Sequence, residues 1–457
     1  MLRPILRPRR VRVVVRLVVG VLSVGVLVAS ALGWVQLRAL DRSTPSASVI
    51  DTPEPTATAA QNILLVGLDT RTDAQGEPLP EEVLAALNAG DTASGGGTAD
   101  SLTVVHLPAG GGRATAISIP RDAYVDLGQG LGRHKINSAW SRAAARATDA
   151  ITAGPGPTGS TSLFAAESAS RPAPGDPAVV RAASAAGARA TIGAVQRLTG
   201  LPIAHFAAVN LAGFADVSTA IGGVPVCLRD PVRDSYTGLA LPAGPQRVSG
   251  PEALAFVRQR HGLPNGDLDR IARQQVFLAG ATEKLLSAGT LADPSALSRI
   301  TAAVSRSVTL DADWDVLAFA RQMQGLSAGA VTFRTIPTGS TQLSTPYDGT
   351  AVEVNPETVR RFVDTAIAAD AGDPAALAAL ASPSGGASDS SVSGVQDRRD
   401  GAASEDDASS RDEDARDESD ESDESDEEED YGPTSAPAAP SFSSPPPITA
   451  AAPGCIN

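Results

Sequence analysis

Three short apolar runs early in the chain predict neighbouring β-strands. They are ILLVGL within Asn62–Asp69, SLTVVHL at Ser101–Leu107, and TAISI at Thr115–Ile119, where Pro120 stops the run. Each run is short, apolar and bounded by polar or turn-forming residues, as buried strands are. A charged residue stands beside each run: Asp69, Asp100 and Arg121. We therefore expect a sheet whose edge carries the chemistry.

The chain from about residue 190 to 380 alternates between strand and helix patterns. Further strands are expected at His205–Val209, Val224–Leu228, Val331–Ile336 and Ala351–Val354. Helices are expected at Ala190–Leu198, Leu211–Ile221, Pro251–Arg260, Asp267–Leu286 and Pro356–Ala368. A short helix is also expected earlier in the chain, at Glu81–Leu87. Residues 142–188 are dominated by Ala, Gly, Ser and Pro, and we expect weak helix and a mobile insertion there. The alternation predicts an α/β fold with a mixed sheet.

The N-terminal residues have the pattern of a membrane anchor. Residues 1–16 contain six arginines and no acidic residue, and residues 17–37 contain no charge. About 20 apolar residues span a bilayer core as a helix, so 17–37 predicts a transmembrane helix with residues 1–16 in the cytoplasm and the domain outside. The alternative is a cleaved signal peptide, because Ala29-Ser30-Ala31 resembles a cleavage site. Residues 41–61, rich in Ser, Thr, Pro and Ala, are expected to form an extracytoplasmic linker.

The net charge of −15 comes from one segment near the C-terminus. Residues 397–430 contain nineteen acidic residues and four arginines, a balance of −15, so the rest of the 457-residue chain is neutral as a set. This segment cannot bury enough apolar surface to offset its ordering entropy, and we predict a disordered acidic and Pro/Ser-rich tail at 382–454. A solvating role is favoured over cation binding. The charge distribution excludes a nucleic-acid binder driven by net positive charge.

The cysteines and histidines restrict the chemistry further. Four histidines are scattered without metal-ligand spacing, so a zinc enzyme is not expected. Cys227 ends the apolar run VPVCL, and Cys455 lies almost at the C-terminus. In an exported chain they can form a disulfide that returns the C-terminus to the domain. The alternative is that Cys227 is a buried apolar residue and Cys455 is free.

Dispersed charges at element ends are the most informative feature of the chain. The sequence from Ala253 to Gln275 places Arg258 and Arg260 before a Gly-containing loop and Arg270, Arg273 and Gln274 on one face of the next helix. Any single arginine is best explained as a solvated surface residue. Together with Arg121, however, these arginines make a group of five, and such a group is suited to phosphate, which a guanidinium group binds through two hydrogen bonds. Two carboxylates, Asp69 and Asp100, could hold Mg²⁺ against a pyrophosphate.

At this point the chain resembles a known family, the LytR–CpsA–Psr cell-envelope glycopolymer transferases. The resemblance is carried, in the family's order, by NILLVGLDTR at 62–71, ADSLTVVHL at 99–107, ISIPRDAYV at 117–125, HKINSAW at 134–140, FADVSTAIGGVPVCL at 214–228 and ALAFVRQRHGLPNGDLDRIARQQ at 253–275. It covers most of the span from Asn62 to Leu286. It implies a three-layer α/β/α domain, placed at 62–380, with a central sheet and a long apolar pocket for a prenyl chain.

The resemblance also implies an activity and roles for single residues. Such enzymes move a glycopolymer from a polyprenyl-pyrophosphate carrier in the membrane to peptidoglycan and form a phosphodiester. By motif match, Asp69 and Asp100 would hold Mg²⁺. The residues that would surround the pyrophosphate are Arg121, Arg258, Arg260, Arg270, Arg273 and Gln274, with Arg71 and Lys135 near them. Asp122 is a candidate general base for the acceptor hydroxyl, with a structural pairing to Arg121 as the alternative.

Two features depart from the family pattern, and two other activities stay open. The family often has Arg-Ser-Asp-Thr before the second strand, whereas this chain has Thr98-Ala99-Asp100-Ser101, which lacks that arginine. The acidic tail is also unlike the family. Hydrolysis of a polyprenyl pyrophosphate would use the same site with water as the acceptor. A non-catalytic envelope lipid-binding or regulatory protein is the other alternative.

Overall fold

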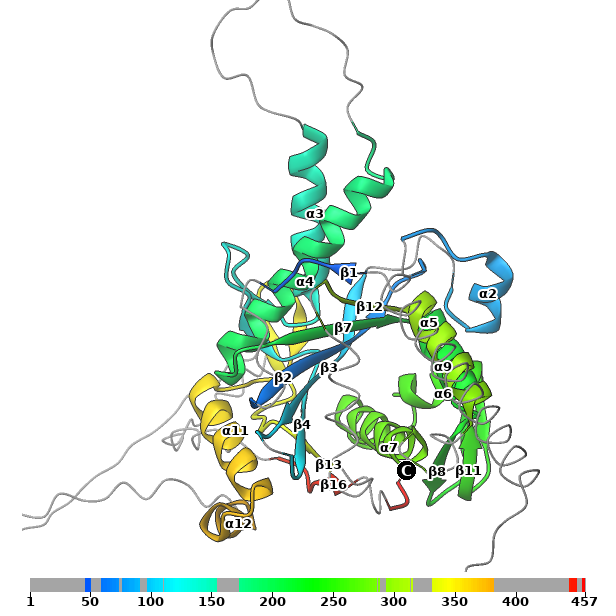
Figure 1. Ribbon diagram of the computed structural model, residues 1–457. Coiled ribbons are helices and arrows are strands. Elements are labelled where there is room, and N and C mark those ends of the chain that lie inside the picture. Colours follow the sequence, from blue (N-terminus) through cyan, green and yellow to red (C-terminus); the bar gives the residue numbers. More distant parts are fainter. Residues whose placement is uncertain are drawn as a thin grey trace, which may run out of the picture. The chain divides into compact units, whose positions relative to one another are not determined.

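The computed structural model in Figure 1 describes the central domain and a short C-terminal piece. The described residues are 46–50, 59–73, 76–90, 97–109, 111–153, 172–285, 287, 293–312, 314, 331–381, 444–449 and 454–456. Within these ranges no helix is both long enough and apolar enough to cross a membrane. The expected transmembrane helix at 17–37, the residues before it and the acidic run at 397–430 lie outside the described residues.

A central sheet of eight strands organises the described residues. In spatial order the strands are β1 (Ser46–Ala47), β12 (Val308–Asp311), β7 (His205–Asn210), β2 (Gln61–Asp69), β3 (Thr98–Leu107), β4 (Ala114–Ile119), β13 (Val331–Thr335) and β16 (Ile448–Thr449). The pairs β1/β12, β7/β2 and β4/β13 are parallel, and the other neighbours are antiparallel. The expected α/β fold with a mixed sheet is confirmed.

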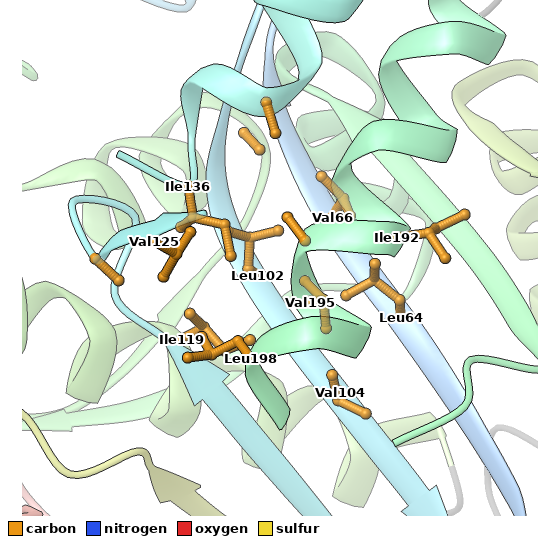
Figure 2. Packing of buried hydrophobic residues seen from close by; sticks show 14 of the residues in the cluster. Leu64, Val66, Leu102, Val104, Ile119, Val125, Ile136, Ile192, Val195 and Leu198 are labelled. Atoms are coloured by element: carbon orange, nitrogen blue, oxygen red, sulfur yellow. The ribbon is translucent and has the colours of Figure 1, made fainter. Parts of the chain in front are cut away.

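One face of the sheet is covered by α3 (Ser138–Ala153), α4 (Pro177–Thr199) and α11 (Pro356–Asp370). Alternate residues of β2 and β3 point to this face, among them Leu64 and Val104, because successive side chains of a strand alternate between faces. They pack against Ile192, Val195 and Leu198 of α4, as Figure 2 shows. The expected helix at Ala190–Leu198 is thus the last part of a longer helix whose apolar side closes this core.

The opposite face is covered by α5 (Leu211–Ala220), α6 (Gly250–Arg258), α7 (Asp267–Leu285) and α9 (Pro294–Ser307) (Figure 1). Asn210 caps α5 by accepting a hydrogen bond from the Gly213 amide at 2.7 Å, and α9 packs against α5. Gln275 attaches α7 to the sheet, because its Nε2 donates to Ser118 Oγ and Thr335 Oγ1 at 3.0 Å each. The two helical layers and the sheet form the expected three-layer arrangement.

Small hairpins and short helices complete the described fold. The two-stranded pairs are β5 (Tyr124–Asp126) with β6 (Arg133–Lys135), β8 (Val224–Leu228) with β11 (Gly244–Val248), β9 (Val232–Asp234) with β10 (Leu239–Leu241), and β14 (Leu343–Thr345) with β15 (Gly349–Ala351). The remaining helices are α2 (Glu81–Ala86) and α12 (Pro374–Ala381). The expected strand at Ala351–Val354 is shorter and lies earlier, although Val352 still bridges to Ala123.

Two expectations about the less regular segments require correction. Residues 46–47, expected in the linker, pair with β12 as the edge strand β1, so the sheet includes residues before Asn62. Within the expected tail, residues 448–449 form β16 on the edge of the sheet.

The helix expected in the Ala-rich stretch 142–188 is present. This stretch contributes most of α3 and the first half of α4, because frequent alanine favours helix and its small side chains let the two helices pack closely. Residues 154–171, part of the expected mobile insertion, lie outside the described residues.

A disulfide holds the C-terminus on the domain. Cys227 of β8 is bonded to Cys455, and the two Cα atoms are 4.4 Å apart. Next to the bridge, the Ile456 amide donates to the Cys227 carbonyl at 3.0 Å and the Arg229 amide donates to the Ile456 carbonyl at 2.8 Å. Ile448 and Ile456 pack against the core beside α6 and α7. Residues 444–449 and 454–456 are therefore part of the folded domain, contrary to the expected disordered tail at 382–454.

We predict that removing this disulfide destabilises the domain. The bridge joins residues 228 positions apart, and cross-links of this kind typically contribute about 2–4 kcal/mol by restricting the unfolded chain. Cys455→Ser should therefore lower the urea midpoint of unfolding under non-reducing conditions and raise the m-value, because the unfolded chain becomes less compact. The double variant Cys227→Ser/Cys455→Ser should have the same urea midpoint as the single variant. Dithiothreitol should lower the urea midpoint of the wild type and leave that of both variants unchanged. A single variant as stable as the oxidised wild type would contradict this role.

Candidate active site

The two predicted metal ligands lie on neighbouring antiparallel strands. Asp69 ends β2, and Asp100 lies near the start of β3, with Thr98 opposite Asp69. The register shifts between Gly67, which faces Ser101, and Leu68, which faces Ala99, so Asp100 is an extra residue in β3. Such a bulge redirects a side chain out of the regular alternation. The geometry of this strand pair thus brings Asp100 to the end of the sheet where β2 finishes.

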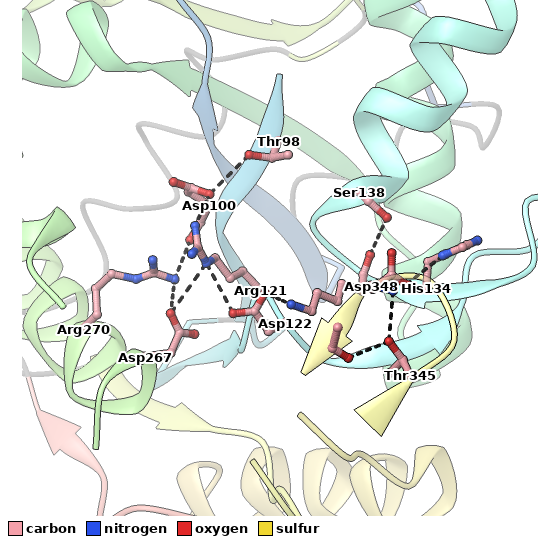
Figure 3. Close-up of polar contacts among 12 residues, drawn as sticks. Thr98, Asp100, Arg121, Asp122, His134, Ser138, Asp267, Arg270, Thr345 and Asp348 are labelled. Atoms are coloured by element: carbon pink, nitrogen blue, oxygen red, sulfur yellow. Dashed lines mark hydrogen bonds and ion pairs between the residues drawn. The ribbon is translucent and has the colours of Figure 1, made fainter. Parts of the chain in front are cut away.

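Arg121 is the centre of the charged cluster in Figure 3. It follows β4, the strand next to β3, and its Nη1 donates to Asp100 Oδ1 at 2.7 Å. Its Nε lies 3.6 Å from Asp122 Oδ2 and 3.7 Å from Asp267 Oδ1. Arg270, one turn into α7, pairs with the same Asp267 and donates to the Asp100 backbone carbonyl at 3.4 Å. Two sheet strands and the first turn of α7 therefore meet at one group of alternating charges.

Burial and the neighbouring opposite charges shift the pKa values of this cluster in opposite directions. Burial disfavours the charged form of Arg121, but the carboxylates of Asp100, Asp122 and Asp267 outweigh it and raise the pKa of Arg121. Burial raises the pKa of Asp267 even though Arg270 and Arg121 act in the opposite direction. Burial also lowers the pKa of Arg270 to about 10. Both arginines are therefore cationic at neutral pH.

Arg71 and Lys135 extend the cluster on two sides. Arg71 Nη1 pairs with Asp69 Oδ1 at 2.8 Å, and its Nε and Nη2 donate to the Ala89 carbonyl at 3.0 and 2.6 Å. Arg71 is 8% exposed, so it fixes Asp69 and the loop after α2 rather than reaching into solvent. Lys135 Nζ lies 3.4 Å from Asp122 Oδ1. Asp122 thus has a cation on each side. Its pairing with Arg121 is the structural role that the sequence left open as the alternative to a general base.

The four remaining predicted phosphate ligands divide into three environments. Arg258 and Gln274 line a cavity, and Arg258 Nη1 also approaches the carbonyls of Leu87 and Asn88 at 3.5 and 3.4 Å. Arg260 is exposed, and its charge acts on Asp267 and Arg270.

Arg273 differs from the other arginines, because it is fully buried with its guanidinium 5.1 Å from the Phe256 ring centroid. Burial lowers its pKa to about 10, while the carboxylates of Asp269 and Asp234 act to raise it. The role of Arg273 at the pyrophosphate therefore stays a prediction.

An apolar cavity of about 320 Å³ opens beside the charged cluster. Its walls come from the sheet strands β2, β3 and β7 and from α5, α6 and α7, with Phe214, Val217 and Phe277 among the large side chains. Asp100, Arg258 and Gln274 are among its few polar lining residues. The helix at Ala190–Leu198 is not part of this wall, because it lies on the other face of the sheet and its apolar side packs in the core shown in Figure 2.

Asp69 and Asp100 are the carboxylates that would hold the predicted Mg²⁺. Mg²⁺ commonly uses one or two carboxylates and completes its shell with water and substrate phosphate oxygens. Asp69 is paired with Arg71, and Asp100 is paired with Arg121. Within the described ranges no three His, Cys, Asp or Glu side chains are grouped to hold a metal ion.

Sequence reasoning missed Asp267 and the pair His134–Asp348. Asp267 stands three residues before Arg270 at the start of α7, where a carboxylate is favoured by the helix dipole, so its spacing was an available signal. His134 Nδ1 lies 2.8 Å from Asp348 Oδ2, and Arg142 Nη2 lies 3.1 Å from Asp348 Oδ1. Asp348 is more than 200 positions from both partners, and no local pattern identifies such a contact.

Comparison with known proteins gives related sequences with cell-wall functions. The cell wall biosynthesis protein LcpA of Corynebacterium glutamicum is 38% identical over 367 residues, 78% of this chain and 65% of that protein. The chain thus spans less than two thirds of LcpA. The polyisoprenyl-teichoic acid–peptidoglycan teichoic acid transferase TagU of Enterococcus faecalis is 24% identical over 277 residues, 60% of this chain and 68% of that protein.

A solved structure and a family model are also similar to this chain. The solved LytR-Csp2A-Psr enzyme from Actinomyces oris has a TM-score of 0.47 and 22% identity, covering 71% of this chain and 96% of that one. The LytR_cpsA_psr family model matches residues 36–359, more than half of the chain. This match includes both predicted metal ligands and every arginine of the charged cluster. The chain belongs to the LytR–CpsA–Psr family.

Proposed function

We propose that the protein transfers a glycopolymer from a polyprenyl-pyrophosphate carrier to peptidoglycan. The observation that carries the proposal is the contact between an apolar cavity and a cluster of arginines and carboxylates, which share Asp100. An amphiphile with a long apolar chain and a pyrophosphate head needs both environments side by side. Membership of the family and the likeness to a teichoic acid transferase support the same reaction.

The prenyl chain would lie in the cavity between the sheet and α5, α6 and α7. Apolar surface removed from water stabilises binding by about 25 cal/mol per Å², so a mostly apolar wall favours a prenyl chain over a sugar. The pyrophosphate would then lie at the polar rim, near Arg258 and Gln274, within the field of Arg121 and Arg270. Bound Mg²⁺, held by Asp69 and Asp100, would neutralise phosphate charge.

In the proposed reaction an acceptor hydroxyl oxygen attacks the phosphorus that carries the glycopolymer. The bond from this phosphorus to the bridging oxygen breaks, prenyl phosphate leaves, and the hydroxyl proton passes to Asp122. Arg121 and Arg270 stabilise the negative charge that develops on the phosphate oxygens, which is the main requirement of phosphoryl transfer. Lys135 and Arg121 hold the Asp122 carboxylate in place. Water in place of the acceptor would give hydrolysis, which product analysis separates from transfer.

The proposed location is the outer face of the cell membrane. The basic residues 1–16 and the uncharged residues 17–37 favour a single membrane helix with the N-terminus in the cytoplasm. A disulfide between Cys227 and Cys455 fits an oxidising compartment. Peptidoglycan, the proposed acceptor, is on the same side of the membrane.

We predict that replacing Arg121 lowers transfer strongly even when the charge is kept. Charge-assisted contacts to phosphate contribute about 1.5–3 kcal/mol, so Arg121→Ala should reduce kcat/KM by roughly ten- to hundredfold or more. Arg121→Lys should also be impaired, because an ammonium group does not reproduce the guanidinium fork. The matched control is Arg361→Ala, whose side chain is 71% exposed on α11. Equal activity of Arg121→Lys and wild type would refute the phosphate role.

We predict a Mg²⁺ requirement that depends on Asp69 and Asp100. Asp69→Asn or Asp100→Asn should raise the Mg²⁺ concentration for half-maximal transfer by about tenfold or more, because a neutral amide binds Mg²⁺ more weakly than a carboxylate. Asp364→Asn, at an exposed position of α11, is the control. Full transfer activity in the presence of a metal chelator would exclude a requirement for Mg²⁺.

We predict that filling the cavity discriminates against long prenyl chains. Ala281 of α7 lines the cavity, and Ala281→Phe should raise KM for a long-chain donor by about tenfold while a short-chain analogue is little affected. Ala145→Phe, at an exposed position of α3, is the size-matched control. A uniform loss of activity with donors of every length would indicate misfolding rather than a prenyl site, and thermal unfolding of each variant checks this.

A further inference from the structure

A second polar group lies beyond Asp122, away from the cavity. It consists of His134 on β6, Arg142 on α3, and Tyr347 and Asp348 in the turn between β14 and β15, and we refer to it as the outer patch. Figure 3 shows the His134–Asp348 pair on the other side of Asp122 from Asp100 and Arg270. None of these four residues lines the cavity. The donor site described above leaves the outer patch without a role.

The outer patch is rigidly connected to the reacting centre through the backbone. The Val352 amide donates to the Asp122 carbonyl at 2.8 Å, and the Tyr124 amide donates to the Val352 carbonyl at 2.9 Å. Directly after β6, the amides of Ile136 and Asn137 donate to the carbonyls of Ala123 at 2.9 Å and Arg121 at 3.0 Å. Both hairpins are therefore attached directly to residues 121–124. A ligand held by the outer patch has a defined position relative to Asp122.

The turn at Tyr347 is tightly held, yet its ring is presented to solvent. Asp348 is held by His134 and Arg142, its amide donates to Thr345 Oγ1 at 3.0 Å, and Gly349 closes the turn with φ of +64°. Tyr347 is 82% exposed and is one of only three large apolar or aromatic side chains exposed among the described residues. Its ring centroid is 6.3 Å from that of His134. A rigid exposed ring gives contact area at low entropic cost.

The geometry of phosphoryl transfer indicates which substrate reaches this patch. The attacking and leaving oxygens lie roughly in line on opposite sides of the phosphorus. A prenyl chain in the cavity directs the leaving oxygen toward Asp100 and Gln274. The acceptor hydroxyl must then approach from the Asp122 side, past Lys135 and the outer patch. Resting on the proposed function, this argument assigns the outer patch to the acceptor rather than to the prenyl carrier.

We propose that the outer patch is the subsite for the acceptor glycan strand, with a sugar ring stacked on Tyr347. The apolar face of a sugar ring matches an exposed aromatic ring, and sugar hydroxyls and stem-peptide carboxylates match the imidazole and guanidinium groups of His134 and Arg142. Asp348 holds the turn and is a positioning residue. The glycan portion of the donor has the same chemistry, so the test must separate the two sources.

The test combines direct binding with transfer kinetics. Soluble peptidoglycan glycan strands are titrated into the purified full-length protein, and KM is measured separately for strands and for lipid-linked donor. Tyr347→Ala should weaken strand binding and raise the strand KM by about fivefold or more, with donor KM unchanged. Tyr347→Phe, which keeps the ring, should restore most binding. Tyr236→Ala is the matched control, because Tyr236 is 71% exposed and stacks on His261 instead.

The outcomes separate this subsite from the proposed function. If the wild-type protein binds strands but transfers no polymer, and Tyr347→Ala loses strand binding, the subsite is supported and the transferase activity is refuted. Active wild type with unchanged strand binding and strand KM in Tyr347→Ala would refute the subsite alone. A rise in donor KM instead of strand KM would assign the patch to the donor glycan and overturn the proposal. Equal effects of Tyr236→Ala and Tyr347→Ala would overturn it as well.

Discussion

The rest of the site depends on the ion pairs that Arg121 forms with three carboxylates. A cation that is largely removed from water must be paired, and Arg121 meets carboxylates from β3, from its own neighbour and from α7. The same contacts hold the ends of β3 and β4 against the start of α7. Because Asp267 is shared with Arg270, two guanidinium groups stay close together in spite of their repulsion. The two guanidinium groups thus have fixed positions in the absence of any ligand.

Helix α7 connects this polar cluster to the apolar part of the site. Its first turns carry Asp267 and Arg270, and its later turns supply Phe277 and Ala281 to the cavity wall. Gln275 attaches the same helix to the ends of β4 and β13. Polar and apolar environments therefore meet along one helix, as the proposed amphiphilic donor requires.

The C-terminal piece supports the same region from outside. Residues 448–449 extend the sheet next to β13, and the disulfide fixes Cys455 on β8. Ile448 packs against the cores that include α7, so the folded C-terminus helps to hold that helix in place. A domain with only a modest aromatic content gains stability from a covalent closure of this kind.

The sequence by itself determined the strands and the identity of the central charges. The runs that became β2, β3 and β4 were recognised because buried strands need uninterrupted apolar residues, and the motif match identified Asp69, Asp100 and Arg121. The tertiary structure decided which charges meet. Arg270 and Arg273 have the spacing of one helix face, yet Arg270 pairs with Asp267 while Arg273 lies over Phe256. The pairing of Asp348 with His134, and of Cys227 with Cys455, joins residues more than 200 positions apart. Such contacts depend on how the layers pack, because the energy of a buried charge or a cross-link is set by its neighbours in space and not by those along the chain.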